Sequence, residues 1–268
     1  MLDKFKKIIY EICDEEKISY RELSSGWIIE LNKNGKIKYI TGMRFPLNNY
    51  STATILNDKF ATYSILSDAR VPVIEHNIFF NPSVREEYNS MFFTPEDVVS
   101  YFNKQDNHTI IIKANDGFGG KEVFKCTSIE EIYNCLEELF KYKDSVCVCP
   151  FYDIKCEYRL VYLKDECKLI FGKVAPKNGW KHNLAQGANV VLDVPSSVAR
   201  KLKEIASSVL KLLDCEFVSI DIAELEDGRM LVMEVNSSVS VVKFSEISED
   251  NRITAKEIYK DAIKLCFK

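Results

Sequence analysis

The stretch IIIKANDGFGGKEVFK (residues 110–125) places Lys113 at the end of an apolar run and follows it with three glycines within four residues. A Walker loop would need a glycine at Asn115 and a Ser or Thr at Glu122. A dinucleotide-binding fingerprint would need its third glycine at Glu122 and a helix afterwards, whereas EVFKC alternates like a strand. The spacing therefore excludes both familiar phosphate loops.

What remains is a hairpin with a glycine-rich tip. Residues 109–113 and 122–126 are rich in strand formers and would pair on either side of ANDGFGGK. Glycine adopts backbone conformations that other residues avoid, so N–H groups at such a tip can turn toward an anion. Taken alone, the stretch is more often an ordinary turn than a phosphate site, and the rest of the chain has to decide between the two.

Length and composition indicate a globular protein. The 268 residues, 46% hydrophobic and 28% charged, can bury a substantial core in one large domain or in two to three lobes. No apolar run approaches the ~20 residues that span a bilayer. The amino end is also too charged for a signal peptide. We expect a cytoplasmic protein that has no membrane partner.

Charge and cysteine usage narrow the classes of partner. A net charge of −4 and a pI near 5.6 give no general attraction to nucleic acid. The nine cysteines lack C-x-x-C spacing and the three histidines lie far apart, so neither a disulfide framework nor a zinc site is indicated. We expect a small molecule or a peptide as the partner.

Periodicity predicts an α+β protein in which antiparallel hairpins alternate with single helices. The Asn34-Gly35 pair would form one hairpin turn, and Ser128 with Glu131 has the spacing of a helix capping box. We expect helices at residues 2–13, 57–69, 128–142, 196–213 and 253–267. We expect strands or hairpins at residues 27–40, 70–76, 109–126, 145–151, 156–174, 189–195 and 216–238.

The sharpest cluster of polar residues is Asp221, Glu234 and Asn236. Glu234 and Asn236 are two apart on one predicted strand and share a face, and Asp221 on the preceding strand can point to that same face. Magnesium prefers such carboxylate and carbonyl oxygens. The alternative is that both acids face solvent, although each interrupts an otherwise apolar run where an unpaired carboxylate is costly. On these residues alone the two interpretations are about equally supported.

Two cations end or interrupt other apolar strands. Lys113 closes an isoleucine run, and Arg159 lies within EYRLVYL, so each is aimed either into a cleft or out to solvent. Arginine can hold a carboxylate or phosphate with two parallel hydrogen bonds, whereas lysine acts as a mobile point charge. Their roles depend on the residues around them.

The ordered set of motifs resembles the ATP-grasp superfamily. It consists of the NDK lysine, Lys113, the glycine hairpin, a Pro-aromatic hinge, the arginine strand, the WKHN loop, and then Asp221 and the Glu-x-Asn pair. The resemblance covers residues 51–268 and is strongest to the branch that contains ribosomal-protein glutamate ligases, bifunctional glutathione synthetases and cyanophycin synthetase.

The resemblance implies a fold as well as a domain division. Two α+β subdomains would grip ATP between antiparallel sheets, preceded by a short N-terminal lobe at residues 1–50. Within the ATP-grasp domain, residues 51–268, the lid subdomain would occupy about residues 70–148 and the metal-binding subdomain residues 149–268.

The resemblance also implies roles for individual residues. Nucleotide contacts are expected at Lys59, Lys113, Gly117, Phe118, Gly119, Gly120, Cys149, Pro150, Phe151 and Asp153. Magnesium ligands are expected at Asp221, Glu234 and Asn236, and catalytic roles at Arg159, Lys173 and Asn183. Of the two lysines that flank the glycines, Lys113 rather than Lys121 is the expected phosphate contact.

The implied activity is ATP- and magnesium-dependent joining of a carboxylate to an amine, through an acyl phosphate, with release of ADP and phosphate. The substrates would be small molecules or peptides, and relatives commonly form homodimers or larger homo-oligomers. Two alternatives stay open, namely a kinase of the same fold and a nucleotide-binding module without turnover.

Some positions depart from the family pattern. Pro150 stands where the hinge usually carries an acidic or amide side chain, and Glu157 replaces the common aspartate before the arginine. Lys177, Trp180 and Lys181 form a basic loop that would suit an acidic substrate or would only be exposed.

Asp221→Asn and Glu234→Gln are both expected to abolish activity while the fold is kept.

Overall fold

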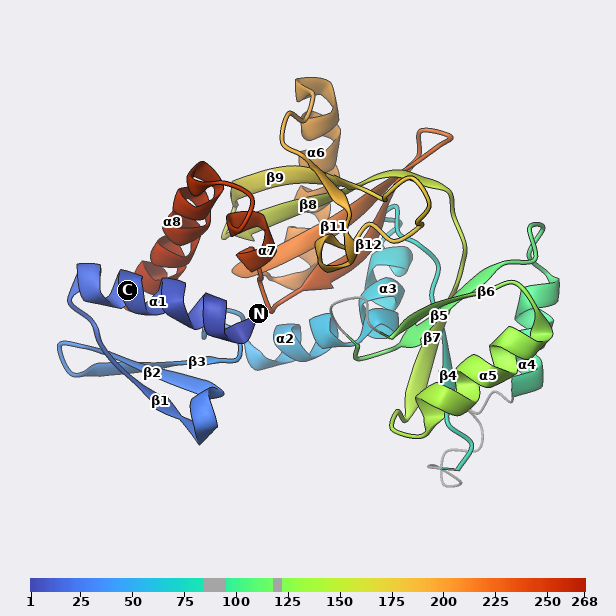
Figure 1. The fold of residues 1–268 in the computed structure, drawn as a ribbon, viewed down its shortest axis with the longest axis horizontal. Coiled ribbons are helices and arrows are strands. Elements are labelled where there is room, and N and C mark those ends of the chain that lie inside the picture. Colours follow the sequence, from blue (N-terminus) through green and yellow to red (C-terminus); the bar gives the residue numbers. More distant parts are fainter. Residues whose placement is uncertain (84–94, 118–121) are drawn as a thin grey trace.

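The computed structural model describes residues 1–83, 95–117 and 122–268, and the described residues form three antiparallel sheets set side by side (Figure 1). The helices are α1 (Leu2–Glu16), α2 (Tyr50–Asn57), α3 (Lys59–Asp68), α4 (Pro95–Asn103), α5 (Ile129–Phe140), α6 (Ser196–Leu213), α7 (Val242–Ser245) and α8 (Glu249–Cys266), with 3-10 turns at Ser24–Gly26 and Leu184–Gln186. The strands are β1 (Ser19–Leu23), β2 (Ile28–Lys33), β3 (Lys36–Thr41), β4 (Asn77–Phe80), β5 (Ile110–Ala114), β6 (Val123–Cys126), β7 (Ser145–Pro150), β8 (Ile154–Leu163), β9 (Glu166–Val174), β10 (Asn189–Val191), β11 (Phe217–Leu225) and β12 (Met230–Asn236). The α+β fold class is confirmed.

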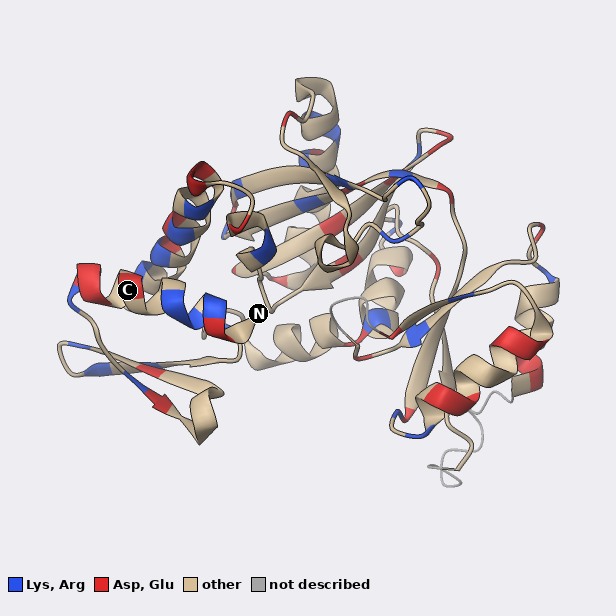
Figure 2. Cartoon of the chain, in the orientation of Figure 1, with Lys and Arg blue, Asp and Glu red and all other residues tan. Residues whose placement is uncertain are grey.

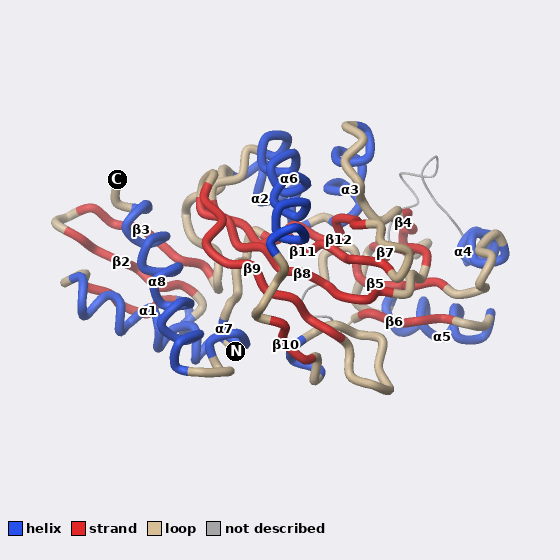
Figure 3. Tube along the Cα trace, turned by 90° about the horizontal axis from the view of Figure 1, so that it is seen from above, coloured by secondary structure: helices blue, strands red, loops and turns tan. Residues whose placement is uncertain are grey.

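The middle sheet has five strands in the order β10-β9-β8-β11-β12. One face is covered by α2, α3 and α6, whose apolar residues meet those of the strands in one core, for example Leu66, Leu202 and Val209 against Leu160 and Ile220. Figure 3 shows α6 lying along this sheet. The predicted helix at residues 196–213 is confirmed, and its apolar stripe is what seats it there.

The first fifty residues pack against the last thirty. Phe5 of α1 meets Phe45 and Tyr259 edge to face, and Tyr259 lies on α8. These residues share a core with Phe217 on the opposite face of the middle sheet from α6. Beside this core, lysines of α8 pair directly with acids at the end of α1, for example Lys256 with Glu15 at 2.6 Å and Lys260 with Glu16 at 3.1 Å. Figure 2 shows the charged positions along both helices. The residues expected to form a leading lobe therefore share their core with the C-terminal helix.

The third sheet has the order β4-β7-β5-β6 and carries α4 and α5 on one face. The predicted capping box is confirmed, because the Ser128 hydroxyl accepts from the Glu131 N–H at 3.2 Å while the Glu131 carboxylate accepts from the Thr127 N–H at 2.6 Å. On its other face, Ile111 and Cys149 join an apolar cluster with residues of the middle sheet. This cluster lies between the two sheets.

One predicted strand is misplaced. Residues 71–76 do not belong to a sheet strand; β4 begins at Asn77. Val232 N–H donates to the Pro72 carbonyl at 2.8 Å, and Ile74 N–H donates to the Val232 carbonyl at 2.9 Å. Pro72 has no N–H of its own, so the segment can make only an isolated bridge to β12. The segment thereby ties the third sheet to the middle one.

Besides the shifted strand β4, the elements β1, α2, α4 and α7 were not expected from the sequence. In β1 every residue from Ser19 to Glu22 is exposed, so no apolar alternation marks this strand. Packing within the fold, rather than a local pattern, defines them. Among the described helices, none combines the length and the apolar character needed to cross a bilayer.

Tyr259→Phe should lower the free energy of unfolding by about 1–3 kcal/mol, because the buried hydroxyl accepts from the Val241 N–H at 2.9 Å. The removal leaves that buried N–H unsatisfied. Urea denaturation measures the change. Tyr50→Phe, on a side chain 85% exposed, is the matched control and should change stability by less than about 0.5 kcal/mol. Equal effects of the two substitutions would contradict this account of the core.

Candidate functional site

A buried charge cluster lies on the face of the middle sheet that also packs against the first and last helices. Asp221 of β11 is opposite Arg159 of β8 in the sheet register. Two hydrogen bonds join them: Arg159 Nε donates to Asp221 Oδ1 at 2.9 Å, and Arg159 Nη2 donates to Asp221 Oδ2 at 2.6 Å. The Asp221 side chain is only 4% exposed. The arrangement is a bidentate pair in the centre of the sheet.

Lys173 of β9 completes the cluster. Its ammonium donates to Asp221 Oδ1 at 3.1 Å and also to the carboxylate of Glu157 on β8. Glu157 and Lys173 are register partners in adjacent strands, so their side chains share a face. Two cations and two anions thus compensate one another where water has little access.

These contacts set the charge state of Asp221. Burial alone would raise its pKa, but the charges of Arg159 and Lys173 outweigh burial and bring the pKa to about 2. Burial lowers the pKa of Arg159, and the same carboxylate outweighs this and holds it above its ordinary value. Because the folded pKa of Asp221 lies below the ordinary 3.8, the pairing stabilises the fold above that pH, and its contribution is lost as the pH falls toward 2.

The other two expected metal ligands lie beside this cluster on β12. Glu234 is the register partner of Asp221, and Asn236 is the partner of Ser219. Directly opposed residues of an antiparallel pair point to the same face, so Asp221, Glu234 and Asn236 present their oxygens on one side of the sheet. The structure brings together the ligand set expected from the sequence.

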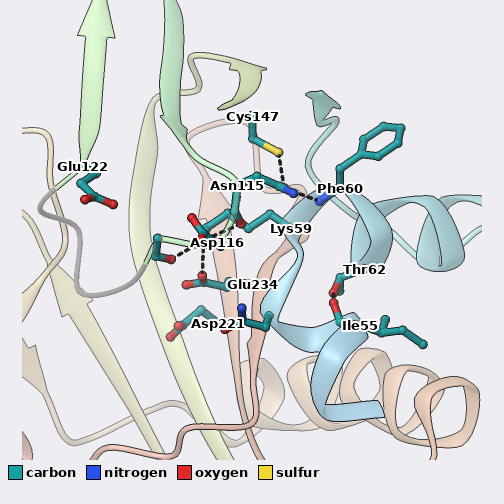
Figure 4. A network of polar contacts seen from close by, with 12 residues as sticks. Ile55, Lys59, Phe60, Thr62, Asn115, Asp116, Glu122, Cys147, Asp221 and Glu234 are labelled. Carbon is teal, nitrogen blue, oxygen red and sulfur yellow. Dashed lines mark hydrogen bonds and ion pairs between the residues drawn. The ribbon is translucent and has the colours of Figure 1, made fainter. Parts of the chain in front are cut away.

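Lys59 links Glu234 to the glycine hairpin. From the first turn of α3, its ammonium lies 3.3 Å from Glu234 Oε1, 3.3 Å from the carbonyl oxygen of Asn115, and within hydrogen-bonding distance of the Gly117 carbonyl (Figure 4). The Lys59 side chain is 10% exposed. One ammonium therefore joins the start of the glycine stretch to β12.

The oxygen set is chemically suited to magnesium. Asp221 and Glu234 supply carboxylates and Asn236 an amide oxygen, which are hard donors. In this structure ammonium and guanidinium groups balance the two carboxylates. Within residues 1–83, 95–117 and 122–268, no group of three or more His, Cys, Asp or Glu side chains is placed to hold a metal. A magnesium ion here would therefore depend on the Asn236 oxygen, on waters and on ligand oxygens.

Lys113 stands at the base of the same region. It lies on β5 between Val123 of β6 and Cys147 of β7 and is half-buried. Gly117 is half-buried, and a Cβ added to it would come within 2.9 Å of the Glu122 carboxylate. The expected contacts at Phe118, Gly119 and Gly120, as well as Lys121, lie outside the described residues.

The expected adenine hinge follows β7. Cys149 is buried, and the Phe151 ring meets Trp180 edge to face with centroids 6.2 Å apart. The Phe151 N–H already donates to the Thr109 carbonyl at 3.3 Å, so this backbone donor is engaged within the fold. Pro150 ends the strand and Asp153 is exposed. The apolar cluster between the sheets starts at this hinge and includes Met233.

Asn183 lies in the loop after β9. Its side chain accepts from the Ala185 N–H at 2.8 Å and so caps the turn at residues 184–186. The neighbouring His182 is buried and its Nδ1 lies 2.9 Å from the Lys173 carbonyl oxygen, which holds the loop against β9. His182, which the sequence reasoning treated only as part of the loop, is therefore an anchor next to Lys173.

Two further residues were missed because their signals are weak in sequence. Asn115 is buried, and its Oδ1 accepts from the Phe60 N–H at 3.1 Å and from the Cys147 thiol at 3.0 Å. Lys143 pairs with Asp116 at 2.9 Å and with Glu122 at 3.4 Å, on either side of the glycines. An asparagine at a strand end and a lysine in a turn are too common to be singled out, and only the fold gives them these partners.

Comparison with known proteins tests the resemblance. The model of the RimK-like ATP-grasp domain matches residues 56–259, about three quarters of the chain. The chain belongs to the RimK-like ATP-grasp family. The match includes every expected site residue, and the recognition made from the ordered motifs is confirmed.

Individual relatives of this RimK-like protein are distant. The alpha-aminoadipate–LysW ligase LysX of Saccharolobus solfataricus is 27% identical over 195 residues, which cover 71% of this chain and 64% of that ligase. The matched part is thus less than two thirds of that relative's own length.

Solved structures share the fold at low identity. D-alanyl-alanine synthetase A of Vibrio cholerae superposes with a TM-score of 0.67 at 12% identity, over 98% of this chain and 92% of that one. The ATP-grasp ligase PsnB, complexed with a precursor variant, Mg and ADP, superposes with a TM-score of 0.54 at 17% identity, over 80% of this chain and 62% of that one. At these identities the likeness shows the fold of the RimK-like chain.

The charge cluster changes the stability expected of Asp221→Asn. The substitution leaves Arg159 and Lys173 with one carboxylate between them, so it should lower the free energy of unfolding by about 3–5 kcal/mol. Chemical denaturation measures it. Asp227→Asn, which breaks the exposed pair with Arg229, is the control and should cost less than about 1 kcal/mol. If Asp221→Asn were as stable as the control, the buried cluster would not be an energetic unit.

Proposed function

We propose that this RimK-like protein is an ATP- and magnesium-dependent ligase that joins a carboxylate to an amine and releases ADP and phosphate. The observation that carries the proposal is the single sheet face on which Asp221, Glu234 and Asn236 gather beside Arg159 and Lys173. Phosphoryl transfer needs positioned charge rather than a covalent side chain, because negative charge spreads over the transferring oxygens.

The nucleotide would lie between the third and the middle sheet. The apolar cluster there, which includes Ile111, Cys149 and Met233, offers the kind of surface that an adenine ring packs against. Lys113 and Lys59 stand at the phosphate end. The backbone around Cys149, Pro150 and Phe151 would contact the base, although the Phe151 N–H already donates to the Thr109 carbonyl. Asp153, which is exposed, would act at the rim.

Asp221, Glu234 and Asn236 would hold magnesium, which would supply positive charge to the phosphates. Lys59, which pairs with Glu234 in this structure, would be free to turn to the phosphates when Glu234 serves as a ligand. Arg159 and Lys173, anchored by Asp221 and Glu157, would stay fixed in direction and stabilise the transferred phosphoryl group with Asn183.

Support for a carboxylate and an amine as substrates comes from relatives. LysX is named as a ligase of alpha-aminoadipate and LysW, and PsnB was solved with a precursor. We therefore propose a small-molecule or peptide carboxylate and an amine as the substrate pair. We also propose that residues 1–50 form a lobe and residues 51–268 an ATP-grasp domain, whose two subdomains meet near residue 149. We propose a homo-oligomeric state for the protein.

The activity is tested by release of ADP and phosphate from ATP across a panel of carboxylates and amines. Release should require both substrates together, and the ligated product should appear in equal amount. AMP and pyrophosphate as products would refute the proposal. A stable phosphorylated hydroxyl compound formed without an amine would instead identify a kinase.

Glu234→Gln should lower turnover by more than about 100-fold, since even residues that only support metal ligands are worth about 10- to 100-fold. Its ion pair with Lys59 is partly exposed, so the free energy of unfolding should change by less than about 1 kcal/mol. Glu226→Gln, an exposed acid in the β11–β12 turn, is the control and should keep full turnover. Full turnover in Glu234→Gln would refute the metal site.

A further inference from the structure

His76 has a buried nitrogen that lacks a hydrogen-bond partner. Its ring is 2% exposed, and Nδ1 lies 2.8 Å from the Ile74 carbonyl oxygen. A carbonyl only accepts, so Nδ1 carries the proton and Nε2 presents its lone pair. Nε2 has no hydrogen-bond partner among the described residues. A buried acceptor left unpaired destabilises the folded state, which calls for a partner.

The surroundings limit what that partner can be. The ring lines a cavity of about 10 Å³ together with Lys59, Tyr63 and Glu234, and Lys113 is not among the residues that line it. Such a volume has room for about one water molecule or one ammonium group. The partner of Nε2 is therefore the end of a neighbouring side chain or a single water.

The charges around the ring favour a lysine. Burial, followed by the charge of Lys113 and then that of Lys59, lowers the pKa of His76 well below 6.5. The imidazole is thus neutral, and Lys113 exerts the larger of the two electrostatic effects. The Lys59 ammonium already donates to two carbonyl oxygens and pairs with Glu234.

Lys113 is the donor that lacks an acceptor. Its ammonium makes no hydrogen bond or ion pair with any residue in 1–83, 95–117 or 122–268. Lys113 of β5 and Ile78 of β4 both pair with Cys147 of β7. The strand that begins directly after His76 is therefore separated from Lys113 by one strand, β7. An acceptor without a donor and a donor without an acceptor thus lie in the same region.

We propose that His76 is a positioning residue: the Lys113 ammonium, which does not contact the ring in this structure, turns to donate a hydrogen bond to the His76 Nε2 and is thereby directed toward the nucleotide phosphates. The phosphate part rests on the proposed function. A carboxylate in this place would cancel the charge of Lys113, as Glu234 does for Lys59 in this structure. A neutral imidazole fixes the direction of the ammonium and leaves its full charge to attract phosphate.

The contact itself is tested without nucleotide. The chain has only three histidines, so the ring nitrogens of labelled protein can be assigned by nuclear magnetic resonance. The Nε2 resonance of His76 should shift in Lys113→Met and stay in place in Lys125→Met, a control on the adjacent strand β6. If the chemical shift of the His76 Nε2 were the same in Lys113→Met as in the wild type, the proposal would be overturned and a water would be indicated as the partner.

The role in binding is tested by a double-mutant cycle on the affinity for a non-hydrolysable ATP analogue, measured by calorimetry. His76→Leu should weaken affinity about fivefold when Lys113 is present and not at all in Lys113→Met, because the one hydrogen bond at stake joins the Lys113 ammonium to a neutral acceptor. His76→Gln, which keeps an acceptor near the Nε2 position, should recover most of the affinity. Additive effects, or no rescue by Gln, would overturn the positioning role.

The two proposals fail separately. If the wild-type protein did not bind the analogue, the nucleotide-binding function would be refuted, while the resonance experiment would still decide whether His76 and Lys113 are in contact. Thermal unfolding of each variant without nucleotide shows whether an altered affinity reflects the site or a loss of folded protein.

Discussion

The bidentate pair between Arg159 and Asp221 is the constraint around which the rest of the protein is arranged. The pair joins the central strand of the middle sheet, β8, to its neighbour β11. Lys173 adds a second cation to Asp221, and Glu157 balances the charge of Lys173. Apolar cores lie on both sides of this charged patch along the same sheet face. They exclude water from its flanks and leave its centre as the place where polar chemistry can occur.

In the same arrangement, each expected metal-binding carboxylate forms an ion pair with at least one cation. Asp221 is shared by two buried cations, and Glu234 is held by Lys59, which also grips the Asn115 and Gly117 carbonyls. The Lys59 side chain therefore couples the charge of Glu234 on the middle sheet to the position of the glycine hairpin. A ligand that binds Glu234 would break its ion pair with Lys59 and thereby alter the hydrogen bonds of Lys59 at the hairpin as well.

Sequence alone anticipated the elements with strong periodicity and the order of the motifs. The Glu234-x-Asn236 pair opposite Asp221 followed from strand alternation, which is a local rule. It did not anticipate that Arg159 and Lys173 would be bound to Asp221, nor that Asn115 would accept from the Phe60 N–H of α3, because those contacts join strands and helices far apart in the chain. The strand expected at residues 70–76 was misplaced for the related reason that the bridge between Val73 and Val232 depends on the neighbouring sheet.

The contact between the first and last helices has a consequence for how the chain acquires its structure. Glu11 and Arg252 are 241 positions apart, and the core around Phe5 is completed by Tyr259. During synthesis from the amino end, α1 and the β1–β3 sheet emerge long before their partner exists. α1 can pack on β2 and β3 early, but the part of this core that Tyr259 completes stays open until α8 is made. This contact is therefore among the last to form, and closing so long a loop makes the step slow.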